Sequence, residues 1–260
     1  MRMVWIILGA SLVVLLIPIG NLYINQRKIV FKQQSLDRSV DHVRENQPYE
    51  ITFRRDGVQL HGWLLRRDRE HLVIYYGGNA EGLSCSIDRF KELDDYAVLL
   101  VNYRGYGDSG GSPTEKDLVA DGLSILDEVR DLYKKISILG RSLGTGVAIQ
   151  VAAQRAVDRL ILVTPFDSVI SVGKRMFPWA PTSLLVKDPF LSIEACANVT
   201  APTLFVLAEE DYVIPRSHSE SLAEAWPLEY EWVEVPGSDH NSISEFPLYW
   251  KSLREFFGED

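Results

Sequence analysis

The chain has 260 residues, of which 46% are hydrophobic and 24% are charged, a composition that suits one α/β domain with a sizeable core and excludes extensive disorder. Its formal net charge of −9 argues against a nucleic-acid-binding protein, because such proteins normally carry a basic face. Cys85 and Cys196 are its two cysteines, too few for a disulfide framework or a cysteine-based zinc site.

An uncharged apolar run opens the chain. Residues 3–20 contain no charged side chain, and they approach the ~20 residues that a helix needs to cross a bilayer. Trp5 and Tyr23 would then lie near the two interfaces, where such rings are favoured. No small-residue cleavage site follows, which disfavours a secretory signal peptide, and a buried core helix also fits poorly. We therefore predict a single N-terminal membrane anchor over residues 1–25. Basic residues on both flanks leave the side of the membrane open.

Residues 26–48 are polar and charged, and we interpret them as a juxtamembrane connector. Beyond them, short apolar runs alternate with longer amphipathic stretches. Strands are expected within residues 49–53, 60–65, 72–76, 96–103, 135–140, 160–164, 203–208 and 230–235. Asp56-Gly57 between the first two is a hairpin signal. Strands alternating with helices predict a mostly parallel sheet covered by helices on both faces, as one domain over residues 49–260.

The clearest helix is expected after residues 107–111. Ser112-Pro113-Thr114-Glu115 has the form of a capping box with proline at the first helical position. We therefore predict that this helix begins there, with Ser112 as its N-cap.

Two serines lie in the pattern G-x-S-x-G, which surrounds the nucleophile of some hydrolases: Ser109 in GDSGG and Ser142 in GRSLG. Such a nucleophile sits on a sharp turn that joins a strand directly to a helix. The expected strand at 135–140 leads straight into the second motif, and an alanine-rich segment follows it. A loop precedes Ser109, and the expected helices contradict the all-β proteases that also use GDSGG. We predict that Ser142 is the nucleophile and that Ser109 belongs to a glycine-rich loop.

A base and an acid should follow such a serine along the chain, the acid first. His218 and His240 are the two histidines beyond Ser142. His240 lies in a polar loop after the last expected strand and is the predicted base, whereas His218 is expected in an exposed amphipathic helix. Asp211 follows the preceding strand and is predicted to hold the imidazole. Asp167 is the alternative acid.

Acyl transfer also needs donors for the developing oxyanion. We expect two backbone N–H groups to be these donors. One belongs to Leu143, directly after the nucleophile, and the other to Asn79, in the glycine-containing loop after residues 72–76. The segment from residue 164 to residue 203 is expected to shape the substrate pocket. Its predicted lining residues are Phe166, Met176, Phe177, Trp179 and Leu185.

Seven stretches carry a family resemblance: DGVQLHGWLL, YYGGNAEG, NYRGYGDSGGSPTE, GRSLGTGVA, PFDSV, EEDYVIP and GSDHNSI. With these motifs in this order, residues 49–257 resemble the α/β-hydrolase superfamily, and within it the membrane-anchored ABHD13, ABHD17 and Bem46-like group. The resemblance implies the α/β-hydrolase fold and a triad of Ser142, Asp211 and His240. The sequence departs from the family pattern at Gly77, where histidine is usual, and at Ala208, where glycine is common.

These features together predict a serine hydrolase of the carboxylesterase or acyl-thioesterase kind. His240 would take the Ser142 proton, the serine would attack an ester, thioester or amide carbonyl, and water would release the acyl group. This chemistry needs no metal ion or organic cofactor, and the expected partners are a small or lipid-like acyl substrate and the membrane. Two alternatives stay open: a peptidase of the serine aminopeptidase kind, and a catalytically inactive, membrane-tethered interaction module.

Overall fold

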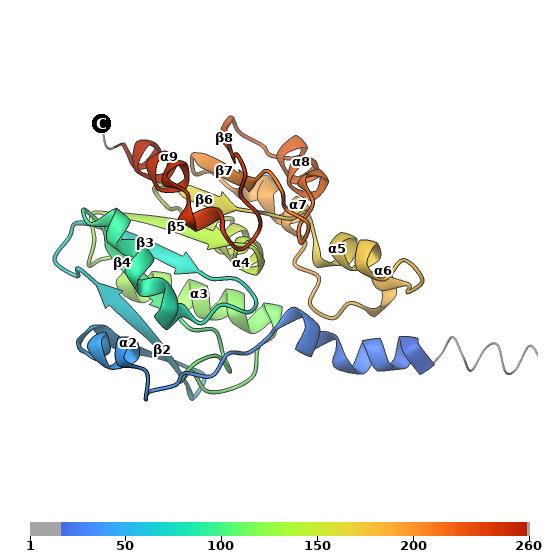
Figure 1. Cartoon of the computed structure of the whole chain (residues 1–260), viewed down its shortest axis with the longest axis horizontal. Coiled ribbons are helices and arrows are strands. Elements are labelled where there is room, and N and C mark those ends of the chain that lie inside the picture. Colours follow the sequence, from blue (N-terminus) through green and yellow to red (C-terminus); the bar gives the residue numbers. More distant parts are fainter. Residues whose placement is uncertain (1–16, 259–260) are drawn as a thin grey trace, which may run out of the picture.

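The computed structural model describes residues 17–258, which fold around one eight-stranded mixed sheet (Figure 1). The order of the strands across the sheet is β1-β2-β4-β3-β5-β6-β7-β8. Their bounds are β1 (Glu50–Arg55), β2 (Val58–Leu65), β3 (His71–Tyr76), β4 (Ala97–Val101), β5 (Lys135–Arg141), β6 (Leu160–Val163), β7 (Thr203–Ala208) and β8 (Tyr230–Val235). Each strand coincides with one of the expected apolar runs.

The sheet is mostly parallel, as predicted. β1 and β2 form the antiparallel hairpin, in which Asp56 and Gly57 adopt φ angles of +49° and +75°, and β2 also pairs antiparallel with β4. The other neighbouring pairs are all parallel. Because the carboxyl ends of parallel strands meet at the same edge, the loops after β3, β5, β6, β7 and β8 gather there. A site built from these loops would lie at that edge.

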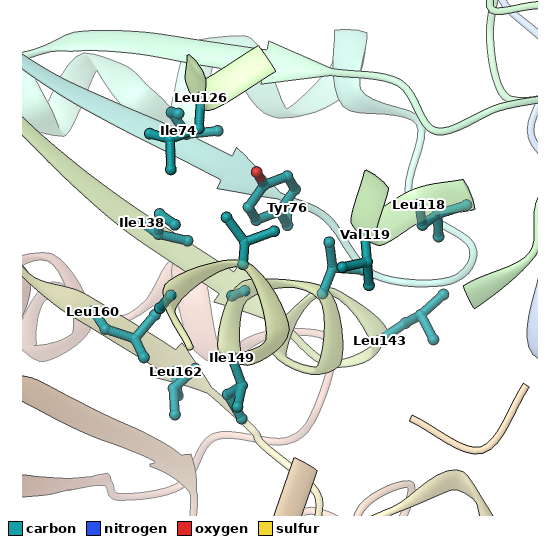
Figure 2. Close-up of a cluster of buried hydrophobic side chains, with 14 of the residues drawn as sticks. Ile74, Tyr76, Leu118, Val119, Leu126, Ile138, Leu143, Ile149, Leu160 and Leu162 are labelled. Carbon is teal, nitrogen blue, oxygen red and sulfur yellow. The ribbon is translucent and has the colours of Figure 1, made fainter. Parts of the chain in front are cut away.

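Helices cover both faces of the sheet. α3 (Glu115–Val129), α4 (Leu143–Ala152) and α8 (Arg216–Glu224) pack over one face, and η2 (Leu83–Leu93) and α9 (Pro247–Phe257) pack over the other. In Figure 2, Ile138 and Leu160 from the strands belong to the same buried cluster as Ile149 of α4, and all three are fully buried. Fully burying each such side chain contributes about 1.5–3 kcal/mol, so this core fixes α4 firmly against the sheet.

Shorter helices complete the chain. They are α2 (Asp41–Glu45), η1 (Gln47–Tyr49), α5 (Val169–Met176), α6 (Thr182–Leu185), α7 (Ser192–Ala195), η3 (Cys196–Asn198) and η4 (Ile243–Glu245). α5 and α6 lie in the segment between β6 and β7, which the sequence assigns to the substrate pocket.

α3 begins two residues later than the expected cap. Its N-cap is Thr114, whose Oγ1 accepts the Asp117 N–H at 3.1 Å and donates to the Asp117 carboxylate at 2.8 Å. Ser112 is therefore not the cap, and Pro113 precedes the helix instead of opening it. An aspartate three residues after the threonine takes the place that a glutamate has in the usual capping box.

A helix covers residues 17–30 of the described chain, and it crosses the predicted boundary between anchor and connector at residues 25 and 26. We call it the N-terminal helix. Among residues 17–258, no helix is both long and apolar enough to span a bilayer. Most of the predicted anchor, residues 1–16, lies outside the described residues, so the anchor stays a prediction.

Candidate active site

Ser142 lies at the turn between β5 and α4, with φ 51° and ψ −121°. A positive φ is unfavourable for a residue with a side chain, so this turn is strained. Two glycines make the turn possible. A Cβ atom on Gly144 would lie 1.9 Å from the Tyr76 carbonyl oxygen, and one on Gly140 would lie 2.7 Å from the Gly144 oxygen. The close passage of α4 across the sheet therefore requires glycine on both sides of Ser142.

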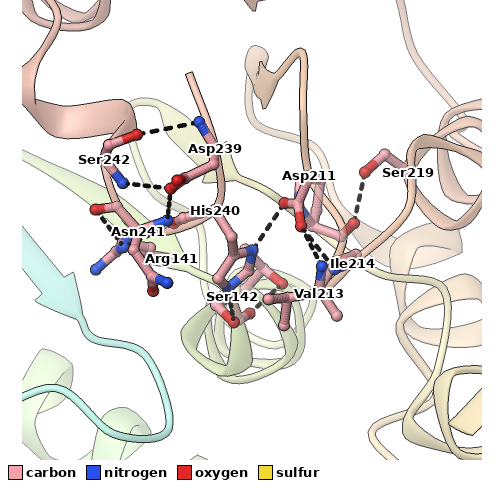
Figure 3. A network of polar contacts seen from close by, with 12 residues as sticks. Arg141, Ser142, Asp211, Val213, Ile214, Ser219, Asp239, His240, Asn241 and Ser242 are labelled. Atoms are coloured by element: carbon pink, nitrogen blue, oxygen red, sulfur yellow. Dashed lines mark hydrogen bonds and ion pairs between the residues drawn. The ribbon is translucent and has the colours of Figure 1, made fainter. Parts of the chain in front are cut away.

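One side chain from a later loop, His240, reaches Ser142, and Asp211 reaches His240 in turn (Figure 3). His240 Nε2 lies 2.9 Å from Ser142 Oγ, and His240 Nδ1 lies 2.7 Å from Asp211 Oδ2. Asp211 Oδ1 accepts the N–H groups of Val213 and Ile214 at 2.9 Å and 2.7 Å. These backbone bonds fix the carboxylate so that its other oxygen faces the imidazole. The structure thus brings the predicted nucleophile, base and acid into one hydrogen-bonded chain.

Arg141 holds in place the loop that carries His240, residues 236–242, which we call the histidine loop. The sequence analysis did not predict this role. Its guanidinium donates to the carbonyl oxygens of His240 at 2.8 Å and Asn241 at 3.3 Å, and it lies 3.4 Å from the Glu81 carboxylate. Glu81 also accepts the Gly78 N–H at 2.9 Å. This buried pair therefore ties together the loop after β3, the serine turn and the histidine loop. No sequence signal marks it, because its members meet only where parallel strands end side by side.

The Glu81 carboxylate accepts two further hydrogen bonds from buried side chains. Tyr75 donates its hydroxyl to the Glu81 carboxylate at 2.8 Å, and Ser86 does the same at 2.5 Å. Burial raises the pKa of Tyr75 well above its ordinary value, so this phenol stays a neutral donor. Burial opposes the charge of Arg141, but Tyr75 and Glu81 outweigh that effect and raise the pKa of Arg141. The guanidinium accordingly stays charged at neutral pH.

The expected oxyanion donors lie in two segments that line the same cavity as the serine. Leu143 is the first residue of α4, where a backbone N–H has no acceptor within the helix. Asn79 lies in the loop after β3 and lines the same cavity as Ser142 and Leu143. The Asn79 carbonyl accepts the Lys32 N–H at 3.1 Å and the Tyr106 hydroxyl at 2.8 Å. The main chain of this loop is therefore held in place beside the serine.

Ser109 has different surroundings. It is 7% exposed, and its Oγ donates to the Asn102 carbonyl and accepts the His61 N–H, both at 2.9 Å. These two bonds join the loop after β4 to β2. The Ser109 hydroxyl thus holds this loop against β2, and it makes no hydrogen bond to an imidazole nitrogen.

A second aspartate–histidine pair lies near the first. His218 Nδ1 is 2.8 Å from Asp167 Oδ1, and Ser171 donates to the other oxygen of Asp167 at 2.5 Å. Burial opposes the charge of Asp167, but hydrogen bonds from His218 and Ser171 outweigh it and hold the pKa of Asp167 below its usual value. His218 is buried, not exposed as expected, because it points from α8 toward this carboxylate. Asp167 therefore fastens α8 to the start of α5 and is bonded to His218, not to His240.

A cavity of about 380 Å³ opens beside Ser142 and His240. Phe166, Met176, Phe177 and Leu185 line it. Trp179 does not line it: its ring lies edge-on to Phe177 with centroids 6.1 Å apart, and it is 48% exposed. Further apolar lining residues, which the sequence analysis missed, are Leu22, Ile29, Val30, Val213 and Ile214. Among residues 17–258, no cluster of three or more His, Cys, Asp or Glu side chains is placed to hold a metal ion.

This strand order, with helices on both faces and a serine at the turn from β5 to α4, is that of the α/β-hydrolase fold. Residues 60–195 match the alpha/beta hydrolase family, and the chain belongs to that family. A solved esterase from Pyrococcus furiosus shares the fold, with a TM-score of 0.63 at 21% identity over 80% of this chain and 90% of the esterase.

Curated relatives support the same assignment. An uncharacterized protein of Mycobacterium tuberculosis is 35% identical over 221 residues, which are 79% of this chain and 77% of the relative. Alpha/beta hydrolase domain-containing protein 17C of Xenopus tropicalis is 29% identical over 240 residues, 84% of this chain and 76% of its own. An uncharacterized membrane protein of Saccharomyces cerevisiae is 27% identical over 272 residues, 97% of this chain and 95% of its own. The resemblance expected from the sequence motifs is confirmed.

Proposed function

We propose that this protein is a serine hydrolase that cleaves the ester or thioester bond of an acyl substrate. The observation that carries the proposal is the chain of hydrogen bonds from Asp211 through His240 to Ser142, at 2.7 Å and 2.9 Å. An inactive interaction module would have no need of this alignment, nor of a strained serine. Membership of the alpha/beta hydrolase family supports the same conclusion.

In the proposed reaction, His240 Nε2 takes the Ser142 proton while the serine oxygen bonds to the acyl carbon. The carbonyl electrons move to oxygen, and the N–H groups of Leu143 and Asn79 stabilise that oxyanion, at roughly 3 kcal/mol each. When the intermediate collapses, the alcohol or thiol leaves with the proton from His240. Water then attacks the acyl-enzyme in the same manner and releases the acid. Asp211 holds the imidazole and stabilises its cation.

The lining of the cavity predicts the preferred acyl chain. Phe166, Val172, Met176 and Phe177 make an apolar surface beside the nucleophile. We expect esters of medium or long acyl chains to exceed acetyl esters in kcat/KM, since each methylene that finds a pocket contributes about 1–3 kcal/mol of discrimination. A series of nitrophenyl esters and thioesters of graded length, with aminoacyl amides beside them, measures this. A flat dependence would count against an acyl pocket, and a preference for the amides would favour a peptidase.

We also propose that residues 3–20 anchor the protein to a membrane. The run is uncharged, and the Saccharomyces cerevisiae relative carries the description of a membrane protein. The full chain should sediment with membranes and need detergent for release. A chain that lacks residues 1–16 keeps the N-terminal helix and should become soluble while it retains hydrolase activity. Recovery of the full chain in the soluble fraction without detergent, or a mature chain that begins after the run, would contradict the anchor.

A further inference from the structure

We infer that the N-terminal helix is a wall of the acyl pocket and that its residues set the length of acyl chain that the pocket accepts. The inference rests on the proposed hydrolase function and concerns which substrates fit, not the chemistry. Four residues of the helix line the cavity that contains Ser142: Leu22, Gln26, Ile29 and Val30. Their spacing of i, i+4, i+7 and i+8 puts them on one face of a helix, so a whole helical face borders the cavity.

Two polar side chains fix this helix against the end of α6 and the segment that follows it. The Gln26 side chain, which is 9% exposed, donates Nε2 to the Leu185 carbonyl at 3.0 Å and accepts the Lys187 N–H at 2.7 Å. Arg27 pairs with Asp188 through two hydrogen bonds, at 2.7 Å and 3.3 Å. Asp188 is buried, and paired bonds of this kind restrict geometry as well as adding energy. The helix therefore cannot turn about its axis without losing these bonds, and the same face stays toward the cavity.

The chain that leaves the helix leads directly to the reacting centre. Phe31 is buried and packs edge-on against Phe190, with ring centroids 6.3 Å apart. The next residue, Lys32, donates its N–H to the carbonyl of Asn79, the proposed oxyanion residue, at 3.1 Å. The wall of the pocket and the loop beside Ser142 are thus parts of one packed unit.

The ligand that fits this wall is an aliphatic acyl group. Leu22, Ile29 and Val30 face the cavity with hydrocarbon alone, and both polar ends of the Gln26 amide are bonded to main chain. α5 and α6 close the cavity with Val172, Met176 and Leu185. An acyl chain between these walls would remove apolar surface from water on both sides, at roughly 25 cal/mol per Å².

The helix itself supplies a matched control. Ile29 lines the cavity, whereas Ile24 in the same helix is 75% exposed and borders no part of it. Ile29→Trp should therefore fill the pocket, and Ile24→Trp should place the same ring in solvent. We compare kcat/KM for a dodecanoyl ester with kcat/KM for an acetyl ester and take the ratio of the two. Ile29→Trp should lower this ratio by at least about 10-fold, because the loss of even one methylene contact has an effect of that size. Ile24→Trp should leave that ratio unchanged.

Ile29→Ala makes the opposite change, because it enlarges the pocket. The acyl-chain length with the highest kcat/KM should therefore increase in this variant. Binding of a fluorescent fatty acid to the Ser142→Ala protein gives a readout that needs no catalysis: Ile29→Trp should weaken it about 10-fold, and Ile24→Trp should not. An unchanged ratio and unchanged binding in folded Ile29→Trp protein would overturn the inference. So would equal losses for all chain lengths. Wild-type protein without hydrolase activity would instead contradict the proposed function, and the binding comparison would still decide whether the helix forms the wall.

Discussion

Ser142→Ala should abolish labelling by a fluorophosphonate probe and lower kcat by several orders of magnitude. The hydroxyl at the strained turn is the atom that His240 Nε2 contacts at 2.9 Å, so its removal deletes the proposed nucleophile and should leave the rest of the site in place. Loss of one triad member in a serine hydrolase leaves only about 10³–10⁴-fold catalysis over water. In-gel labelling and steady-state hydrolysis of a nitrophenyl ester measure the two effects.

Ser109→Ala is the matched control, because it removes the same hydroxyl from the same pentapeptide pattern. Labelling and turnover of the folded protein should stay close to those of the parent. The free energy of unfolding should fall by about 1–3 kcal/mol, since the His61 N–H and the Asn102 carbonyl lose a buried partner. Denaturant titration measures that loss. Labelling of Ser109 in the Ser142→Ala protein would contradict the assignment, and labelling lost in neither variant would mean another nucleophile.

The strands could be predicted because a strand inside a parallel sheet is buried on both faces and must be apolar throughout. β7 shows this clearly: each of its residues from Thr203 to Ala208 is buried. The serine turn could be predicted for a similar reason. Gly140 and Gly144 lie where any side chain would collide with the main chain. The tight packing around the turn therefore requires glycines that can be recognised in the sequence.

The sequence pattern could not predict that the N-terminal helix lines the cavity beside Ser142. Gln26 and Arg27 are polar, and polar residues beside an apolar run suggest a solvated connector. In the structure their polar atoms bond to the main chain near Leu185 and to the buried carboxylate of Asp188. A sequence does not distinguish a solvated polar residue from one that finds a buried partner more than a hundred residues away.

The burial of His218 could not be predicted for the same reason, since the residue it faces, Asp167, lies in the loop after β6, 51 residues away in the sequence. Gly77 is a position that the sequence does mark, but only as a departure from a family pattern, without a reason for the glycine. A Cβ atom there would lie 2.7 Å from Leu83 Cδ2, so the loop as folded has little room for a side chain. Both features depend on contacts that only the folded chain makes.

Asp211→Asn should lower kcat by about 10⁴-fold, the loss expected when the acid of such a triad becomes an amide. The amide oxygen can still accept the N–H groups of Val213 and Ile214, so the loop should keep its shape. The amide nitrogen then faces His240 Nδ1. Because that nitrogen is a donor, it favours the tautomer with hydrogen on Nε2, which cannot take the serine proton. Single-turnover acylation by a nitrophenyl ester, with thermal unfolding beside it, separates this effect from misfolding.

Asp167→Asn makes the same chemical change in the neighbouring pair, 2.8 Å from His218. It should cost about 1–3 kcal/mol of stability, because it weakens the charge-assisted bonds that hold α8 to the start of α5. Its acylation rate should stay within about 10-fold of the parent, since displacement of a pocket wall affects positioning but not the proton transfer itself. A larger loss of kcat from Asp167→Asn than from Asp211→Asn would assign the acid to Asp167. That assignment would require His240 to leave a carboxylate 2.7 Å away, so the geometry favours Asp211.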